Sequence, residues 1–170
     1  YYASRGFVVF SIDYRLRDHM GTIPQAWIDA TSVGTPSNLD QTFAMYPAHR
    51  DAKAALRWIM ANAQNYHINK DYITVGGGSA GAITSIGIGV SELGDYKDEI
   101  SSSEDNTLST TNLSQTYEVQ TILDFWGSTV SIEILESIYG HQRFDSNDPA
   151  LFIAHGTEDP TVPFSRAEDL

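Results

Sequence analysis

The chain has 170 residues, which suits one domain with a single core, and its 41% hydrophobic and 11% aromatic residues are typical of a globular protein. The formal net charge of -12, without a cluster of Lys and Arg, argues against nucleic-acid binding, because phosphates would be repelled. The absence of cysteine excludes disulfides and thiolate chemistry, and no apolar run approaches the roughly 20 residues that a membrane-spanning helix needs.

The first half of the chain predicts a strand, a loop and a helix. Residues 7–14, FVVFSIDY, form a continuous apolar run, which is typical of a strand buried on both faces. Gly and Pro interrupt residues 18–46, which predict a long loop with one short helix around Trp27. A helix is expected from Pro47 onward, with an apolar stripe toward the core and its charges on the opposite side.

The second half alternates strands and helices around a polar excursion. Residues 94–117 are rich in Ser and Thr and predict a mobile or lid-like segment. The other expected elements are strands at 71–77, 118–127 and 149–156 and helices at 79–93, 131–140 and from 165 onward. Four strands alternating with helices predict a single α/β domain with a mainly parallel sheet and flanking helices.

The stretch ITVGGGSAGAITS fits two motifs. Gly76, Gly78 and Gly81 match the G-x-G-x-x-G loop that binds a dinucleotide. Gly77, Ser79 and Gly81 match the G-x-S-x-G turn that presents a nucleophilic serine. A dinucleotide site needs a second strand about 20 residues further on, ending in Asp or Glu. That distance falls in the polar excursion, which has acids but no strand, so the nucleophile turn is favoured.

The second motif has a physical explanation for each residue. A serine on a sharp turn between a strand and a helix has a strained backbone, and Gly77 and Gly81 let the turn close against the sheet. The backbone N–H of Ala80, in the first turn of the following helix, is expected to donate to an oxyanion with the help of the helix dipole. A glycine-rich bend with an N-cap serine is the structural alternative.

Three stretches resemble one family of enzymes. VFSIDYRL (9–16), the run from Pro47 to the GGGSAG turn, and FIAHGTEDPTVPF (152–164) are similar to the carboxylesterase/lipase group of the α/β-hydrolase fold, whose nucleophile elbow reads Gly-x-Ser-Ala-Gly. The resemblance covers most of the chain and implies that Ser79 is the nucleophile and Asp159 the acid that orients a histidine. It also implies an acyl-enzyme reaction without a metal or cofactor.

Other carboxylates compete with Asp159. From its turn alone, Asp159 also suits a surface role before a proline, and Glu158 is the neighbouring candidate. Asp13, Arg15 and Asp51 are expected to pair for structural reasons. Asp124 lies on a strand apolar enough to shield it, with no assigned role.

The base of the expected triad is missing. The group's chain order is serine, acid, histidine, and no histidine follows Asp159. The resemblance makes His155 structural, and none of the other histidines suits the role: His19, His49, His67 and His141. The group's upstream oxyanion loop is absent too, together with the strand that would fill a slot between residues 7–14 and 71–77.

We therefore expect these 170 residues to be the middle of a larger esterase, incomplete at both ends and nearly inactive alone. A partner segment or chain could instead complete the sheet and supply the histidine. The expected substrate is a small short-chain or aryl ester, with Trp27, Phe43 and Tyr46 as candidates for a pocket wall or for packing. The alternative function is a non-catalytic hydrolase-like module for binding or assembly.

Overall fold

Three parallel strands form one sheet. The computed structural model describes residues 1–32 and 39–170, so Gly34 and Pro36 of the predicted loop lie outside the described residues. The strand order is β1-β2-β3, with β1 at Thr74–Gly78, β2 at Thr121–Phe125 and β3 at Ala150–Ala154. These strands and their parallel pairing confirm the predicted α/β class.

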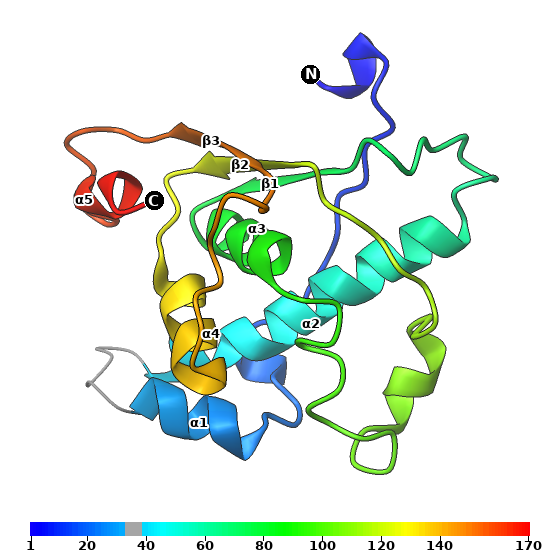
Figure 1. Ribbon diagram of the computed structural model, residues 1–170, viewed down its shortest axis with the longest axis horizontal. Helices are drawn as coiled ribbons and strands as arrows, with labels where there is room; N and C mark the ends of the chain where they lie inside the picture. Colours follow the sequence, from blue (N-terminus) through cyan, green and yellow to red (C-terminus); the bar gives the residue numbers. More distant parts are fainter. Residues whose placement is uncertain (33–38) are drawn as a thin grey trace.

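Helices α1 to α4 lie on one side of this sheet, and the short helix α5 lies beyond the ends of the strands (Figure 1). Helix α3 packs directly against β1 and β2, while α2 and α4 pack against α3, and α1 contacts α2 and α4. Their bounds are Gln25–Ser32 for α1, Leu39–Ala61 for α2, Ala80–Val90 for α3, Val130–Tyr139 for α4 and Ser165–Glu168 for α5.

The strand side chains divide between a buried and an open face of the sheet. Val75 and Ile122 occupy paired positions on the face toward α3 and belong to the main core cluster. Gly76 and Phe152 stand on the other face, where Phe152 is 54% exposed. Because successive strand residues alternate between faces, this pattern decides which side of each strand contacts the helices.

The expected strand over residues 7–14 is wrong for the described chain. These residues run without strand pairing, and Phe7, Val8 and Val9 are more than half exposed. Phe10 packs edge-on against Trp58 and Tyr66 instead. A strand needs a neighbour for its backbone N–H and C=O groups, and no described strand lies beside this run.

Helix α2 differs from its prediction at its start. It begins at Leu39, so Pro47 lies inside the helix rather than in its first turn. The helix reaches further back because residues 39–46 contain no Gly or Pro, and Asp40 favours the positive end of the helix dipole. Pro47 costs one backbone hydrogen bond within the helix.

The charged side of α2 is buried, contrary to the expected exposed face. Arg50, Lys53 and Arg57 are at most 3% exposed. Arg50 donates to the Lys97 carbonyl, Lys53 Nζ to Ser91 Oγ at 3.0 Å, and Arg57 Nε to the Thr111 carbonyl at 2.8 Å. The three cations are buried because the segment after α3 folds over them and supplies polar partners.

That covering segment contains the predicted excursion 94–117. It carries a short helical turn at Asn106–Thr110, and its apolar side chains Tyr96, Ile100 and Leu108 belong to the main core cluster. These few apolar residues are enough to pack the segment 94–117 against the core, because the buried cations of α2 also bond its backbone carbonyls at Lys97 and Thr111. The proposed lid-like motion of residues 94–117 stays a prediction.

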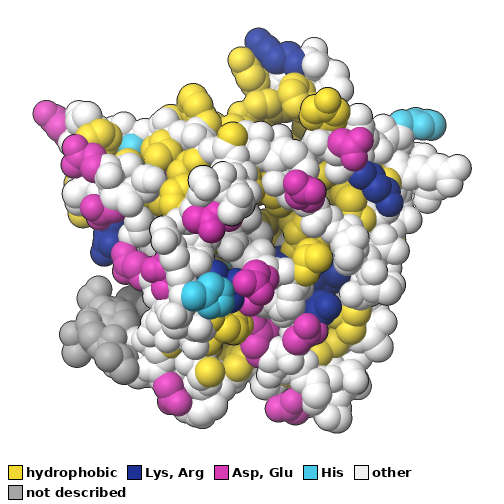
Figure 2. Space-filling view, viewed as in Figure 1, with side chains coloured by type: hydrophobic (Ala, Val, Ile, Leu, Met, Phe, Trp, Pro, Cys, Tyr) yellow, Lys and Arg dark blue, Asp and Glu magenta, His cyan; other side chains and the backbone are white. Residues whose placement is uncertain are grey.

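The face of the molecule shown in Figure 2 carries no single large charged patch. Figure 2 shows Asp and Glu side chains spread in small groups over the visible face, with Lys, Arg and His between some of them. Within the described ranges, no helix has the length and apolar character to cross a membrane. The same residues contain no group of three or more potential metal ligands among His, Asp and Glu.

Candidate functional site at the carboxyl edge of the sheet

Ser79 lies at the turn between β1 and α3, where the sequence motif predicts a nucleophile. Its backbone has φ 53° and ψ -120°, a conformation that side-chain-bearing residues rarely adopt. The Ser79 N–H donates to the Phe125 carbonyl at 2.9 Å, and the Ser79 carbonyl accepts from Ile83. The backbone is thus fixed on both sides, while the hydroxyl does not cap the helix and the residue as a whole is partly exposed.

The two motif glycines have different reasons to be small. A Cβ at Gly77 would lie 2.6 Å from the Gly81 carbonyl carbon, so this position admits only glycine. A Cβ at Gly81 would meet no described heavy atom within 4 Å. The prediction that both residues must be small is therefore supported at Gly77, where a side chain would collide with the backbone of Gly81. It is wrong at Gly81, where a side chain would have room.

Ala80 is the first residue of α3. The first backbone N–H groups of a helix have no acceptor inside the helix and carry the positive end of its dipole. The Ala80 N–H directly follows Ser79 and is available to an oxygen bound beside the hydroxyl. This geometry is consistent with the oxyanion role predicted for it.

The strain at Ser79 gives a stability prediction. Glycine accepts positive φ without a Cβ penalty. We therefore expect the free energy of unfolding of Ser79→Gly to be about 1 kcal/mol higher than that of Ser79→Ala. Both variants lack the hydroxyl, so the comparison isolates the backbone. Urea unfolding followed by circular dichroism measures the difference, and a glycine variant less stable than the alanine variant would show that the turn is unstrained.

Asp159 follows β3 at the same edge of the sheet. Its Oδ1 accepts from the backbone N–H groups of Thr161 and Val162 at 2.7 and 2.9 Å. The N–H groups of Val162 and Thr161 hold the pKa of Asp159 below its ordinary value, so it is ionised at neutral pH. Its neighbour Glu158 is exposed. An ionised, fixed carboxylate suits the predicted acid and equally suits a turn, and no contact with Ser79 joins the two.

His155 is the histidine beside Asp159. Its Nε2 lies 3.7 Å from Asp159 Oδ2 and 2.8 Å from the Val162 carbonyl, to which it must donate. The ring is fully buried, and Nδ1 has no partner among the described residues. His155 is therefore held inside the β3 loop and is not presented to Ser79, consistent with the structural role that the resemblance implies.

The remaining histidines lie away from the elbow turn. His49 is buried inside α2 rather than at a helix start, and its Nε2 lies 3.0 Å from Ser131 Oγ. His141 faces Glu92 at 3.4 Å. His19 ends a short helical turn, and His67 lies in the loop after α2. Within the described chain, no histidine ring bonds the Ser79 hydroxyl.

Asp124 is shielded, as its strand predicts. Its side chain is fully buried, and Oδ1 accepts from the Gly127 N–H at 2.6 Å, whereas Oδ2 has no described partner. Burial raises the pKa of Asp124, while the Gly127 bond and the nearby His155 act in the opposite direction. Asp124 thus closes the loop after β2.

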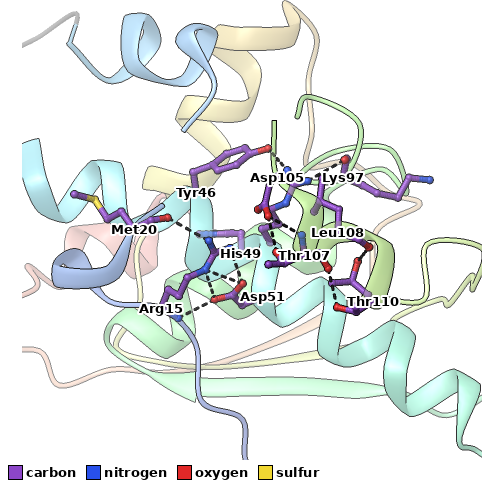
Figure 3. A network of polar contacts seen from close by, with 12 residues as sticks. Arg15, Met20, Tyr46, His49, Asp51, Lys97, Asp105, Thr107, Leu108 and Thr110 are labelled. Atoms are coloured by element: carbon purple, nitrogen blue, oxygen red, sulfur yellow. Dashed lines mark hydrogen bonds and ion pairs between the residues drawn. The ribbon is translucent and has the colours of Figure 1, made fainter. Parts of the chain in front are cut away.

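Arg15 and Asp51 pair as predicted and join the N-terminal segment to α2 (Figure 3). The Arg15 guanidinium donates to both carboxylate oxygens of Asp51, with Nη2 at 2.8 Å from Oδ1. Asp13 is exposed and takes no part in the described ion pairs. A cavity of about 420 Å³ lies beside Arg15, between residues 21–22 and 103–107. Its lining includes neither Ser79 nor Asp159, so it is separate from the candidate site.

The strand register adds a residue that the motifs did not indicate. Because Gly78 pairs with Phe125, the last residue of β2, the residue that follows the strand, Trp126, lies beside Ser79. An aromatic residue after an apolar strand is a weak signal, since only the register shows which neighbour it has. Trp27 and Tyr46, the expected pocket-wall candidates, are instead buried in the core.

A parallel α/β sheet with a strained serine between its first described strand and the next helix defines the α/β-hydrolase class. The BD-FAE family model matches residues 39–143, more than half of the chain and including Ser79. The chain belongs to the BD-FAE family, an α/β-hydrolase family, which places it among the hydrolases of that type. No curated protein and no solved structure matched the chain.

Proposed function

We propose that the chain is a serine carboxylic-ester hydrolase that acts through an acyl-enzyme on Ser79. The observation that carries the proposal is the Ser79 backbone, which is strained and held at a strand-to-helix turn, in a residue that is partly exposed. Backbone strain of this kind persists only where the surroundings fix it, and it clusters at functional sites. The candidate substrate is a small short-chain or aryl ester.

The reaction follows from the groups around Ser79. Its Oγ attacks the ester carbonyl carbon and loses its proton to a base, while the Ala80 N–H donates to the oxygen that becomes negative. The alcohol leaves with a proton, and water then releases the acid from the serine. Asp159, ionised in its loop, is the group proposed to orient the imidazole of the base.

The base itself is proposed to come from a partner segment or chain. The described histidines are held elsewhere, and His155, the one beside Asp159, donates to the Val162 carbonyl. In a triad, loss of one member costs a factor of about 10⁶ in turnover, because the members act as a unit. The 170-residue chain by itself is therefore expected to be nearly inactive.

Imidazole supplied in solution tests this proposal. Without it, p-nitrophenyl acetate hydrolysis by the chain should match that of Ser79→Ala. With imidazole present, the wild-type chain should release p-nitrophenol faster than Ser79→Ala, whose rate gives the background from imidazole itself. Mass spectrometry should find an acetyl group on the peptide that contains Ser79.

One alternative is a non-catalytic module for binding or assembly, which is favoured because no histidine of residues 1–32 and 39–170 bonds the Ser79 hydroxyl. This alternative predicts equal rates for the wild-type chain and Ser79→Ala with imidazole, and no acetylated Ser79. Fast turnover without imidazole would show instead that the chain contains its own base.

A further inference from the structure

Trp126 has three unusual properties at the carboxyl end of β2. Its backbone φ is 50°, in the left-handed region that a bulky side chain rarely occupies. Its side chain is 45% exposed although it is large and aromatic. It also lies beside Ser79 in the sheet, since the Ser79 N–H donates to the carbonyl of the residue before it, Phe125.

The backbone around Trp126 is fixed by bonds on both sides. The Trp126 N–H donates to the Ala154 carbonyl of β3 at 3.0 Å. The next N–H, of Gly127, donates to the buried Asp124 carboxylate at 2.6 Å. A Cβ at Gly127 would lie 2.9 Å from the Ala82 Cβ of α3, so this loop is tightly packed against the helix that follows the serine. These contacts hold the strained residue in place.

The Trp126 ring packs beside the residue before the serine, Gly78. A Cβ at Gly78 would lie 2.8 Å from Cζ2 of the indole and 3.3 Å from two further ring atoms. The ring therefore rests on the bare backbone of Gly78 and leaves much of its surface to solvent, one residue from the hydroxyl. Phe125 and Phe152 continue this aromatic surface, with ring centroids 6.3 Å apart.

We propose that Trp126 is a specificity-determining residue that contacts the planar ring of an aryl ester held at Ser79. This inference rests on the proposed function, because it takes Ser79 as the reacting group. An exposed indole fixed at a strained backbone position offers a rigid apolar surface. Two aromatic rings in contact bind more tightly than the buried area alone would give. Flat rings are therefore held more tightly than saturated rings of the same size.

The test compares phenyl acetate with cyclohexyl acetate, using NMR spectra of the 170-residue chain that resolve the indole N–H signals. The chain has three tryptophans, of which Trp27 is 2% exposed and Trp58 is 42% exposed on α2. Phenyl acetate should shift the Trp126 signal and leave those of Trp27 and Trp58 unchanged. Its dissociation constant should be about fivefold lower than that of cyclohexyl acetate, the scale of an aromatic pair.

The ratio of the two dissociation constants, cyclohexyl acetate over phenyl acetate, should fall to about one in Trp126→Ala. It should be unchanged in the matched control Trp58→Ala and partly kept in Trp126→Phe. If Trp126→Ala does not fold, the Trp126 signal in the unmutated chain and the Phe variant decide the question. An unchanged preference in a folded Trp126→Ala, or no shift of the Trp126 signal, would overturn the proposal. Ser79→Ala should bind the two esters with the same preference, because binding does not need the hydroxyl. The binding test can therefore be interpreted even if no acetylated Ser79 is found.

Discussion

Replacing Arg143 by alanine should destabilise the protein by about 3 to 5 kcal/mol, the usual cost of leaving one member of a buried ion pair unpaired. Arg143 Nη1 lies 2.7 Å from Asp95 Oδ2, and the two side chains are 3% and 6% exposed. The guanidinium also lies over the Tyr139 ring at 4.4 Å. This pair ties the start of the segment 94–117 to the region after α4. Urea unfolding at neutral pH measures the loss.

Two comparisons make this prediction specific. Lys97→Ala removes a partly exposed pair, in which Lys97 lies 3.5 Å from Asp98, and should cost less than about 1 kcal/mol. The double variant Arg143→Met with Asp95→Leu removes both charges and should recover most of the stability. If the losses measured for the single variants Arg143→Met and Asp95→Leu simply add in the double variant, the pair is not the source of the effect.

Acid should destabilise the fold through His49. Burial lowers the pKa of His49 to about 4, whereas the unfolded chain takes up this proton near pH 6.5. Between about pH 6.5 and 4 the unfolded state is protonated and the folded state is not, so stability falls as the pH drops. The shift corresponds to roughly 3 kcal/mol over this window, fully present above pH 6.5.

The variant His49→Gln isolates this contribution. Its free energy of unfolding should depend less steeply on pH between about 6.5 and 4 than that of the wild type, whatever its absolute stability. His141→Gln is the control, because it removes a histidine that is 52% exposed rather than buried. Parallel curves for His49→Gln and the wild type would contradict the prediction. The ring lies under α3, where a Cβ at Gly87 would collide with it.

Both predictions concern the support of the candidate site rather than the reacting groups. His49 bonds Ser131 of α4 and stacks on Tyr96 at 4.9 Å, beneath the helix that begins at Ala80. Arg143 holds the segment that covers the basic side of α2. If residues 94–117 act as a lid, Arg143→Ala should increase amide exchange there more than in β1 and β2. The same measurement therefore tests the lid prediction.

The motif at Ser79 could be read from the sequence because its causes are local. Glycines at 76–78 and 81 permit the sharp turn, and the flanking apolar runs predict the strand and helix that the structure contains. The parallel sheet follows from the alternation of such runs along the chain. The BD-FAE match confirms the α/β-hydrolase class that the resemblance implied.

The errors at residues 7–14 and on the charged side of α2 concern neighbours that are distant in sequence. Residues 7–14 have the composition of a buried strand, but pairing requires a second strand at the right place. The charges of α2 read as a solvent face, yet the segment up to Thr111 covers Arg57 and supplies its partner. Composition reports what a side chain prefers, whereas burial depends on which segment packs over it.

The sequence by itself determined the class of fold and the strand-to-helix turn at Ser79, and it supplied Ser79 and Asp159 as candidates for the nucleophile and the acid, because periodicity and turn chemistry act over a few residues. Only the tertiary structure decided that His155 is held by the Val162 carbonyl and that Trp126 stands beside the serine. Those facts depend on strand register and on loop bonds between residues far apart in the chain. Local patterns do not specify such long-range contacts, which form only when the whole sheet assembles.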